Sequence, residues 1–509
     1  MALSLYNTLS GRVEEFAPLA GNQVRIYTCG PTVYNYGHIG NYRTFVFQDV
    51  LRRHLKYRGY QVMQVMNLTD VDDKTIRNAR EAGLHLREYT ARFIEAFKVD
   101  RKLLNMDDVE FLVRATDHIP EMVELVQTLQ RKGYAYESEG SIYFKVEAFA
   151  GYGKLSHMKL AGNLAGARVD ADEYEKADVR DFVLWKAAKE DEDSWDTPIG
   201  RGRPGWHLEC SVMAMKYLGA TLDIHSGGTD LIFPHHENEI AQSEAATGQP
   251  FARFWVHGEH LIVNGQKMSK SLGNFYTLRD LIERRYKPTA VRYLLLSVPY
   301  RKPLNFTLDG LKQAEQSLER LRNFRDRLTT ESFASGSNPD LAAGAVAARA
   351  GFEEALDDDL NTAAALGAIF DLVREGNTAM DRGEFREGER GAYLDVLERS
   401  DRVFAVLDDD DYAKLRQYGF IQTGVQTGAP TSAGGAPSTA NAQTAAGRGY
   451  AAPVLVETLT ETEIEGRVSA RERARRSGKY AEADQIRNEL LKAGIIIEDS
   501  KNGTRWKRK

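Results

Sequence analysis

The sequence has two cysteines, and one of them lies just ahead of a histidine–glycine turn. Cys29 follows a short apolar stretch at residues 24–27, and His38-Ile-Gly40-Asn41 comes a few residues later. A histidine and a glycine that open a helix after a strand place an imidazole and backbone N–H groups beside a polyphosphate, and Gly40 lets a nucleotide approach the backbone. A thiol is a good metal ligand. We therefore predict that a metal site and a phosphate site meet here, although such turns are common in ordinary strand-to-helix connections.

A lysine-rich loop near the middle of the chain supplies a second phosphate-binding pattern. Lys267-Met-Ser-Lys270-Ser271 lies between Gly265 and Gly273. Two lysines three residues apart in such a loop can bind triphosphate oxygens. A loop of this composition is more often solvated surface, but its place after the first turn, beyond a long insertion, favours one nucleotide site built from both.

Further metal ligands are available in Cys210 and in the run Phe-Pro-His235-His236-Glu237-Asn-Glu239. Cysteine, histidine and glutamate all bind zinc. His235 and Glu239 are four residues apart, so on a helical turn they share a face. This spacing favours His235 over its competitor His236, which with Glu237 would support the ligands. The two cysteines lie far apart in the chain, and as free thiols they would be ordinary buried small hydrophobes.

The segments around these residues predict a parallel nucleotide-binding sheet. A strand at 24–27, a helix at 44–57 and a strand at 60–67 form a βαβ unit. Later strands at 222–225 and 253–263 flank a helix at 237–246. The first of these later strands ends in His225-Ser-Gly227-Gly228-Thr-Asp230, a glycine turn that is by itself a common loop. The predicted fold class is α/β: a Rossmann-type parallel-sheet catalytic domain with an insertion, then an α-helical bundle and a small C-terminal module.

The domain boundaries follow changes in pattern and composition. Charged, helix-periodic segments begin at 311, and residues 422–452 have almost no bulky apolar side chains. The predicted parts are a Rossmann catalytic domain at 1–110 and 206–260, a connective insertion at 111–205, the lysine loop and a connecting domain at 261–310, a helix bundle that binds tRNA at 311–421, a flexible low-complexity linker at 422–452 and a C-terminal module at 453–509.

Length and composition limit the class of protein. With 509 residues, 42% apolar and 28% charged, the chain is expected to fold as several globular domains. No apolar run approaches the ~20 residues of a membrane span, and the N-terminus lacks the pattern of a secretory signal. Two cysteines cannot form a disulfide framework. We expect a cytoplasmic protein that does not bind membranes.

The C-terminal end differs in charge from the rest of the chain. Residues 467–509 contain thirteen Lys and Arg and six Asp and Glu, whereas the whole chain has a net charge of −6. Such a basic end fits contact with phosphates, although it is more often only solvated. Arg475, Asp484 and Asp499 can read base edges, and Tyr480 can stack on an unpaired base, as in recognition of single-stranded RNA loops.

Taken together, the motifs resemble those of class I aminoacyl-tRNA synthetases, whose signatures are His-x-Gly-His and Lys-Met-Ser-Lys-Ser. The second signature is complete, and Asn41 replaces the last histidine of the first. Cys29, the run Arg203-Pro-Gly-Trp206-His207-Leu-Glu-Cys210 and the run at 233–239 resemble more narrowly the cysteinyl-tRNA synthetases. This resemblance extends from about residue 22 to about 415 and resumes at 463–509.

The resemblance implies a reaction of protein biosynthesis. ATP with Mg²⁺ would activate L-cysteine to cysteinyl-adenylate, which would then be transferred to the 3′ end of tRNA(Cys). It implies one zinc ion per chain, bound by Cys29, Cys210, His235 and Glu239, that binds the substrate thiol and selects cysteine over serine. The catalytic residues would be His38, Asn41, Lys267 and Lys270. ATP would be bound by His38, Gly40, Asn41, Gly227, Gly228, Asp230, Lys267 and Lys270, cysteine by Cys29, Gly30, Thr69 and Trp206, and the anticodon by Arg475, Tyr480, Asp484 and Asp499.

Two other functions fit parts of the pattern. A cysteine:amino-sugar ligase of the mycothiol type would share the zinc and ATP motifs but should lack a tRNA-reading module, so residues 475–506 argue against it. A non-catalytic tRNA-binding protein on the same fold would not need the intact lysine loop and all four metal ligands. We expect a monomeric enzyme, a cysteine–tRNA ligase.

Overall fold

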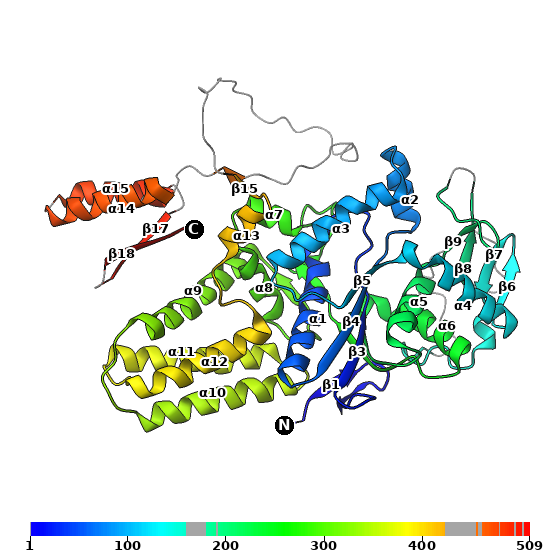
Figure 1. The fold of residues 1–509 in the computed structure, drawn as a ribbon, viewed down its shortest axis with the longest axis horizontal. Coiled ribbons are helices and arrows are strands. Elements are labelled where there is room, and N and C mark those ends of the chain that lie inside the picture. The colour runs from blue at the N-terminus through cyan, green and yellow to red at the C-terminus, as the bar shows by residue number, and fades with distance from the viewer. Residues whose placement is uncertain are drawn as a thin grey trace, which may run out of the picture. The chain divides into compact units, whose positions relative to one another are not determined.

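The computed structural model describes residues 2–158, 180–189, 192–422, 455–456, 461–477, 479–492, 495–500 and 503–508. The chain forms two compact units, one of Met1–Leu281 with Tyr286–Asp408 and one of Ile282–Arg285 with Asp409–Lys509. Figure 1 shows the helices and strands of both. Apart from residue 422, the linker predicted at 422–452 lies outside the described residues.

The first unit is built on a sheet of five parallel strands in the order β11-β10-β3-β4-β5. Their bounds are Gln23–Thr28 for β3, Gln61–Leu68 for β4, Phe111–Arg114 for β5, Leu222–Gly228 for β10 and Ala252–Gly258 for β11. The first strand of the sheet, β3, pairs with the fourth in chain order, β10, so the topology changes direction between them. Ligands of open α/β sheets bind at the carboxyl ends of strands at such a point.

The sheet extends further along the chain than the sequence predicted. Strand β5 pairs in parallel with β4, yet it lies inside the insertion predicted at 111–205. The boundary at residue 110 is therefore wrong, and the interruption of the sheet begins after Arg114. Four half-exposed or exposed residues, Phe111–Arg114, have no alternating pattern long enough to be identified as a strand.

Helix α1, Ile39–Tyr57, packs on the sheet and begins five residues before the predicted start at residue 44. Its buried Phe47, Leu51 and Leu55 join a core that includes Ile26 of β3 and Ile224 of β10. Because α1 starts within the phosphate turn, with His38 as its N-cap, the packing of this helix fixes the position of that turn.

The other elements of the first unit surround the sheet. The hairpin β1 (Ser4–Asn7) and β2 (Arg12–Glu15) comes first, and α2 (Asp73–Glu81) and α3 (Leu86–Leu103) connect β4 to β5. The insertion contains α4 (Ile119–Arg131) and an antiparallel sheet of β6 (Ala135–Ser138), β7 (Ser141–Phe144), β8 (Phe182–Ala187) and β9 (Gly202–Pro204). Then α5 (Trp206–Leu218) precedes β10, and α6 (Glu237–Thr247) connects β10 to β11.

The segment after β11 carries the lysine loop and leads into the bundle. It contains β12 (Leu261–Val263), β13 (Gln266–Lys267), α7 (Leu278–Glu283), α8 (Pro288–Leu296) and β14 (Leu304–Phe306). Four helices follow and pack on one another: α9 (Leu308–Thr330), α10 (Pro339–Asp357), α11 (Thr362–Asp381) and α12 (Glu387–Phe404). The predicted helix bundle is confirmed, but the compact unit that holds it ends at Asp408 and not at residue 421.

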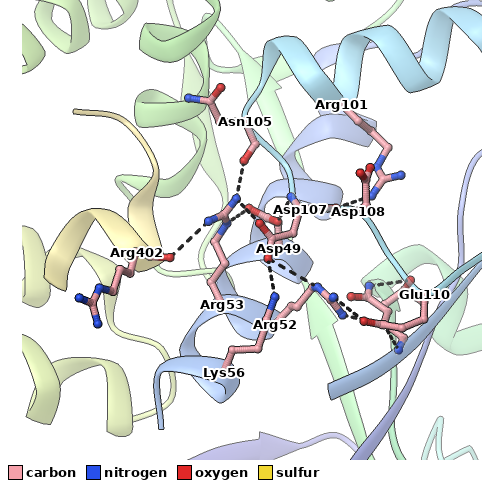
Figure 2. Close-up of polar contacts among 12 residues, drawn as sticks. Asp49, Arg52, Arg53, Lys56, Arg101, Asn105, Asp107, Asp108, Glu110 and Arg402 are labelled. Atoms are coloured by element: carbon pink, nitrogen blue, oxygen red, sulfur yellow. Dashed lines mark hydrogen bonds and ion pairs between the residues drawn. The ribbon is translucent and has the colours of Figure 1, made fainter. Parts of the chain in front are cut away.

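A buried ion-pair network fastens α1 to the loop after α3 and to the end of α12 (Figure 2). Arg53 donates to Asp49 at 2.9 Å and to the carbonyl oxygens of Asn105 and Arg402 at 2.8 and 3.3 Å. Asp49 also accepts from the fully buried Arg292 of α8 at 2.6 Å. A buried charge that loses its partner is strongly destabilising, so this network ties the helix bundle and the sheet together through α1.

The second unit contains the C-terminal module. Helix α13 (Asp411–Gln417) comes first, and β15 (Ile421–Gln422) pairs with β16 (Leu455–Val456). Helices α14 (Glu461–Arg476) and α15 (Tyr480–Lys492) precede a hairpin of β17 (Ile495–Ser500) and β18 (Gly503–Arg508). Their core is Ile464, Val468, Leu490, Ile495 and Ile497. Among the helices of the described residues, none is both long and apolar enough to cross a membrane.

Candidate functional site

The four predicted metal ligands meet at the carboxyl end of β3. Cys29 follows β3, Cys210 lies on α5, His235 lies in the short helical segment Ile232–His236, and Glu239 lies in the first turn of α6. All four side chains are buried, and their ligand atoms lie within 4.8 Å of one another. Both cysteines are free thiols. Two thiols, an imidazole and a carboxylate thus form one group. They come from segments that are far apart in the sequence, because β3 is near the start of the chain and α5 and α6 follow only after the insertion.

The two oxygens of Glu239 have different partners. Oε1 lies 3.0 Å from Nε2 of His235 and 3.9 Å from Sγ of Cys29. Oε2 lies 2.8 Å from Nε2 of His225, which is fully buried in β10. Burial raises the pKa of Glu239, but the charges and hydrogen bonds of His225 and His235 lower it to about 2. Glu239 is therefore a carboxylate, with Oε1 directed to the predicted ligands and Oε2 held by His225.

The pKa values of His235 and Cys210 favour an imidazolium beside a thiolate within this group. Burial lowers the pKa of His235, but Glu239 and Cys210 raise it to about 10. Burial raises the pKa of Cys210, but its hydrogen bond with Cys29 lowers it to about 6. These shifts favour a proton on His235 that balances the charges of Glu239 and Cys210. A metal cation at the same place would replace that proton, which is the expected property of a metal-binding group.

His236 belongs to a second group that meets the same distance condition, Cys29, His225, His236 and Glu239. Its Nε2 lies 3.3 Å from Sγ of Cys29, and its Nδ1 lies 2.8 Å from Nε2 of His257. His257 Nδ1 lies 2.7 Å from the hydroxyl of Thr8. Burial lowers the pKa of His257 to about 3 and that of His236 well below its usual range, so both rings are neutral. The hydroxyl of Thr8, the two neutral rings and the Cys29 sulfur thus form one hydrogen-bonded chain.

Glu237 lies elsewhere than the sequence suggested. Its carboxylate accepts hydrogen bonds from the backbone N–H groups of Gly153, Leu155 and Ser156 at 2.8, 3.1 and 2.8 Å. It therefore fastens the insertion to α6 and does not support the metal ligands beside His236.

Three histidines near the ligands were not predicted to be there. His207 Nδ1 lies 2.8 Å from Nδ1 of His235, His225 contacts Glu239, and His257 contacts His236. The sequence placed His225 with the ATP-binding glycines and gave no role to His207 or His257. A signal was present, because His225 and His257 are polar residues inside buried parallel strands, which normally consist of apolar residues.

The residues predicted to contact cysteine surround the same point. The Gly30 N–H donates to Oδ1 of Asn67 at 2.8 Å, and a Cβ atom at Gly30 would overlap the carbonyl oxygen of Asn67. Thr69 is buried just after β4, and its hydroxyl accepts from Nδ2 of Asn67 at 3.0 Å. The indole of Trp206 stacks on His235 with 4.1 Å between ring centroids. Gly30 thus allows β3 and β4 to approach closely beside Cys29, with Thr69 and Trp206 nearby.

The phosphate turn forms a capping box at the start of α1. The backbone N–H of Asn41 donates to Nδ1 of His38 at 3.2 Å, and the N–H of His38 donates to Oδ1 of Asn41 at 3.1 Å. Burial and Lys270 lower the pKa of His38, Asp230 raises it, and the result is about 4. At neutral pH the ring is therefore neutral, and because Nδ1 accepts a hydrogen bond, the proton is on Nε2.

The lysine loop contacts this turn. Ile39 N–H donates to the carbonyl oxygen of Tyr276 at 2.9 Å, and the ring of His38 lies 5.3 Å from that of Phe275. The ammonium of Lys270 lies 5.2 Å from the centroid of the Phe275 ring. Lys267 and Lys270 are both exposed. The structure therefore brings the two signatures together from positions more than 200 residues apart.

The glycine turn after β10 completes this edge of the sheet. Gly227 and Gly228 end β10, and a Cβ atom at Gly227 would lie 2.8 Å from the ring of His236. Asp230 is exposed, and its carboxylate lies against the backbone of Gly228. A side chain at either glycine would thus displace the histidine or the aspartate.

Asp100 links the helices beside the phosphate turn to the segment after the lysine loop. It accepts from the hydroxyl of Tyr42 at 2.7 Å and from Arg279 at 3.2 Å, and burial raises its pKa to about 6 although both partners lower it. A buried carboxyl whose pKa is raised keeps its proton in the folded state, so stability is lost as pH rises from about 4 to about 6.

We therefore expect Asp100→Asn to gain about 1 kcal/mol in unfolding free energy relative to the unmodified chain between pH 5 and pH 7. Urea unfolding of both proteins at the two pH values measures this difference. Parallel pH dependence of the two proteins would show that Asp100 does not titrate in this range.

The predicted anticodon residues lie in the second unit, and two of them pair with each other. Asp499 of β17 accepts from Arg475 and from Arg471 of α14 at 2.7 Å each. These hydrogen bonds hold the pKa of Asp499 well below its usual range. Tyr480 is two-thirds exposed at the start of α15, and Asp484 is exposed one turn later. An exposed aromatic ring and charged groups thus lie on adjacent elements of one module.

Three family models match the chain. One described as "tRNA synthetases class I (C) catalytic domain" matches residues 15–316, a "DALR domain" matches 351–407, and a "Cysteinyl-tRNA ligase anticodon binding domain" matches 465–506. The first covers the sheet, its insertion and the lysine loop. The second covers the end of α10 and all of α11 and α12, and the third covers most of the segment from α14 to β18.

Relatives match over their whole length. The cysteine–tRNA ligase of Solibacter usitatus is 54% identical over 509 residues, with 100% of each chain covered, and that of Koribacter versatilis is 52% identical with the same coverage. That of Leptospira interrogans is 43% identical and covers 100% of this chain and 99% of its own. Among solved structures, Mycobacterium tuberculosis methionyl-tRNA synthetase in complex with methionyl-adenylate has a TM-score of 0.58 at 15% identity. The match covers 78% of this chain and 94% of that structure's chain, and it shows a shared fold.

Proposed function

The chain belongs to the cysteinyl-tRNA synthetase family, and we propose that it joins L-cysteine to tRNA(Cys) in an ATP-dependent reaction, with a zinc ion bound by Cys29, Cys210, His235 and Glu239 selecting the amino acid. The observation that carries this proposal is the group of four ligand atoms within 4.8 Å of one another at the end of β3, the strand that leads into the phosphate turn. One chain supplies every ligand and both signatures, so we propose that a monomer is active.

The donor set fits zinc. Two thiolates, an imidazole and a carboxylate are ligands that zinc accepts, whereas Mg²⁺ and Ca²⁺ prefer oxygen alone. When bound, a zinc ion would supply a position that a soft thiolate occupies far better than a hydroxyl does. Size alone separates cysteine from serine by only ~1–3 kcal/mol, so this chemistry explains how cysteine can be selected.

We assign Cys210 and His235 to the ligands, and His225 and His236 to their support. Oε1 of Glu239 faces His235 and Cys29, while Oε2 is already bonded to His225. The hydrogen-bonded chain from Thr8 through His257 and His236 ends at the Cys29 sulfur. Groups that donate to a ligand orient it and tune its basicity, and this is the arrangement that surrounds most metal-binding side chains.

The first chemical step forms cysteinyl-adenylate. The carboxylate of cysteine attacks the α-phosphorus of ATP, and pyrophosphate leaves with the bridging oxygen. No covalent bond to the protein is needed, so catalysis consists of positioning and charge stabilisation. His38 donates from Nε2 to a phosphate oxygen, and Lys267 and Lys270 bind the charge that develops on pyrophosphate. When bound with ATP, Mg²⁺ would neutralise part of the same charge. In the second step, the terminal ribose hydroxyl of the tRNA attacks the adenylate carbonyl and AMP leaves.

Asn41 serves the first step in two ways. Its side-chain oxygen caps the N–H of His38, which fixes the turn, and within the described residues its amide nitrogen makes no hydrogen bond. That amide remains available as a donor to ATP. Asparagine therefore replaces the histidine of the family signature as a neutral donor. Gly40, Gly227, Gly228 and Asp230 would shape the nucleotide site, and Gly30, Thr69 and Trp206 the cysteine site.

The C-terminal module would read the anticodon. Tyr480 would stack on an unpaired base, and Arg475, Asp484 and Asp499 would bind base edges. Pairing of Arg475 with Asp499 supports this role, since it holds two recognition groups in place before RNA binds.

The test is exchange of pyrophosphate into ATP, followed by charging of tRNA(Cys). We expect exchange with L-cysteine and not with L-serine, loss of exchange after the metal is chelated, and charging when tRNA(Cys) is added. Absence of cysteine-dependent exchange would contradict the proposed enzyme. Exchange without charging of tRNA would instead favour an amino-sugar ligase.

A further inference from the structure

Glu209 is a fully buried carboxylate beside the predicted ligands. It precedes Cys210 on α5, a helix that packs against β4. Its side chain has no solvent exposure, and neither Oε1 nor Oε2 has a hydrogen-bond partner. Among the described residues, it forms no ion pair. Buried carboxylates are normally paired or hydrogen-bonded, so this one lacks a partner that its position calls for.

Acidic groups, among them Asp70 and Cys210, lie in the surroundings of Glu209. Burial raises the pKa of Glu209 well above its usual range, and Cys210 and Asp70 add to that rise, while Thr69 opposes it. Asp70 differs from Glu209, because both of its oxygens accept from Thr116, one from the N–H at 2.9 Å and one from the hydroxyl at 2.7 Å. Asp70 is therefore satisfied within the protein, whereas neither oxygen of Glu209 has a hydrogen bond of good geometry among the described residues, and the nearby Thr69 hydroxyl offsets only part of the effect of burial.

The missing partner has defined chemistry. It must donate hydrogen bonds to both oxygens, it must be positively charged for Glu209 to bind it as a carboxylate, and it must be small because Glu209 is fully buried. A primary ammonium group meets all three conditions. The α-ammonium of an amino acid whose thiol lies at Cys29 and Cys210 would come close to the residue adjacent to Cys210.

We propose that Glu209 binds the α-ammonium group of the cysteine substrate and so distinguishes cysteine from thiols without an amino group. This inference rests on the proposed function, because it assigns a contact within the same amino-acid site. Thiol and ammonium would then be recognised from adjacent residues of one helix, the thiol at Cys210 and the ammonium at Glu209. Cysteine bound in this way has its carboxylate left for activation beside His38.

The experiment compares three thiols on the zinc-loaded protein and on Glu209→Gln. L-cysteine has both groups, cysteamine lacks the carboxylate, and 3-mercaptopropionate lacks the amino group. Dissociation constants are measured by calorimetry without ATP. We expect Glu209→Gln to weaken binding of L-cysteine and cysteamine by about 30-fold or more, since a buried charge loses its partner. Binding of 3-mercaptopropionate should be unchanged or tighter.

The results distinguish a wrong role for Glu209 from a misfolded variant and from a wrong proposed function. An equal loss for all three thiols, or unchanged binding of L-cysteine, would overturn the role of Glu209. Retained zinc content and retained binding of 3-mercaptopropionate show that the variant is folded. If Glu209→Gln fails to fold, Glu209→Asp takes its place, because it keeps the carboxyl group on a shorter side chain. Glu209→Asp should reduce the preference for cysteamine over 3-mercaptopropionate without abolishing it. An unchanged preference would overturn the proposal. Failure of the proposed function would appear differently, as no cysteine-dependent exchange in the unmodified protein.

Discussion

Glu239→Ala is expected to release the zinc ion and to lower L-cysteine-dependent pyrophosphate exchange by about 100-fold or more. Glu239 is fully buried and contributes Oε1 to the ligands, while His225 holds Oε2. Its removal deletes one ligand and also leaves His225 and His235 without their carboxylate. Zinc content is measured by atomic absorption on the purified protein, and exchange is measured at saturating ATP.

The matched control is Glu244→Ala, one turn further along α6. Glu244 accepts from Lys154 and from the N–H of Phe251, away from the ligands. It should keep one zinc per chain and normal exchange. Normal zinc content in Glu239→Ala would contradict the ligand assignment. Loss of zinc in His236→Ala together with retention in His235→Ala would favour the second group of four.

His38→Ala is expected to lower the rate of adenylate formation by about 100- to 1000-fold while zinc content and L-cysteine affinity stay normal. The neutral ring offers its Nε2 proton to a phosphate oxygen, and this donor acts where charge develops. His38 also accepts from Asn41 N–H, so the variant loses half of the capping box. Single-turnover kinetics separates adenylate formation from cysteine binding.

His85→Ala is the control for this change. His85 is exposed, and although it precedes α3 its side chain makes no capping hydrogen bond. Its rate of adenylate formation should be normal. A reduced affinity for cysteine in His38→Ala, with an unchanged rate of adenylate formation, would place His38 at the amino acid and not at the phosphates.

Much of the fold follows from patterns that are local in sequence. Helix α1 and strand β4 have strong apolar periodicity or clear ends, and the sequence located both. The charged, helix-periodic pattern that begins at residue 311 predicted the bundle. Strand β5 was missed because four residues with half-exposed or exposed side chains have no periodicity of their own. Only pairing with β4, which brings residues 65–68 beside 111–114, makes that segment a strand.

The candidate site was predicted where residue type alone is informative. Cysteine beside a phosphate turn, and a histidine four residues before a glutamate, indicated a metal site, and the resemblance to the cysteinyl-tRNA synthetases supplied the set of four ligands. The supporting residues are positioned by tertiary contacts, and no spacing in the sequence reveals those contacts. His225, His257 and Glu209 reach the ligands only because β10, β11 and α5 converge on the end of β3. The pairing of Arg475 with Asp499 likewise depends on how α14 meets β17.

The most direct test of the central claim is to observe the substrate thiol at the metal. Cobalt(II) substituted for zinc reports thiolate ligands through charge-transfer absorption in the near ultraviolet. With Cys29 and Cys210 as ligands, addition of L-cysteine should add a third thiolate and increase this absorption by about half. L-serine should leave it unchanged. Absorption that does not respond to L-cysteine, or that responds equally to L-serine, would contradict selection of the amino acid by its thiol.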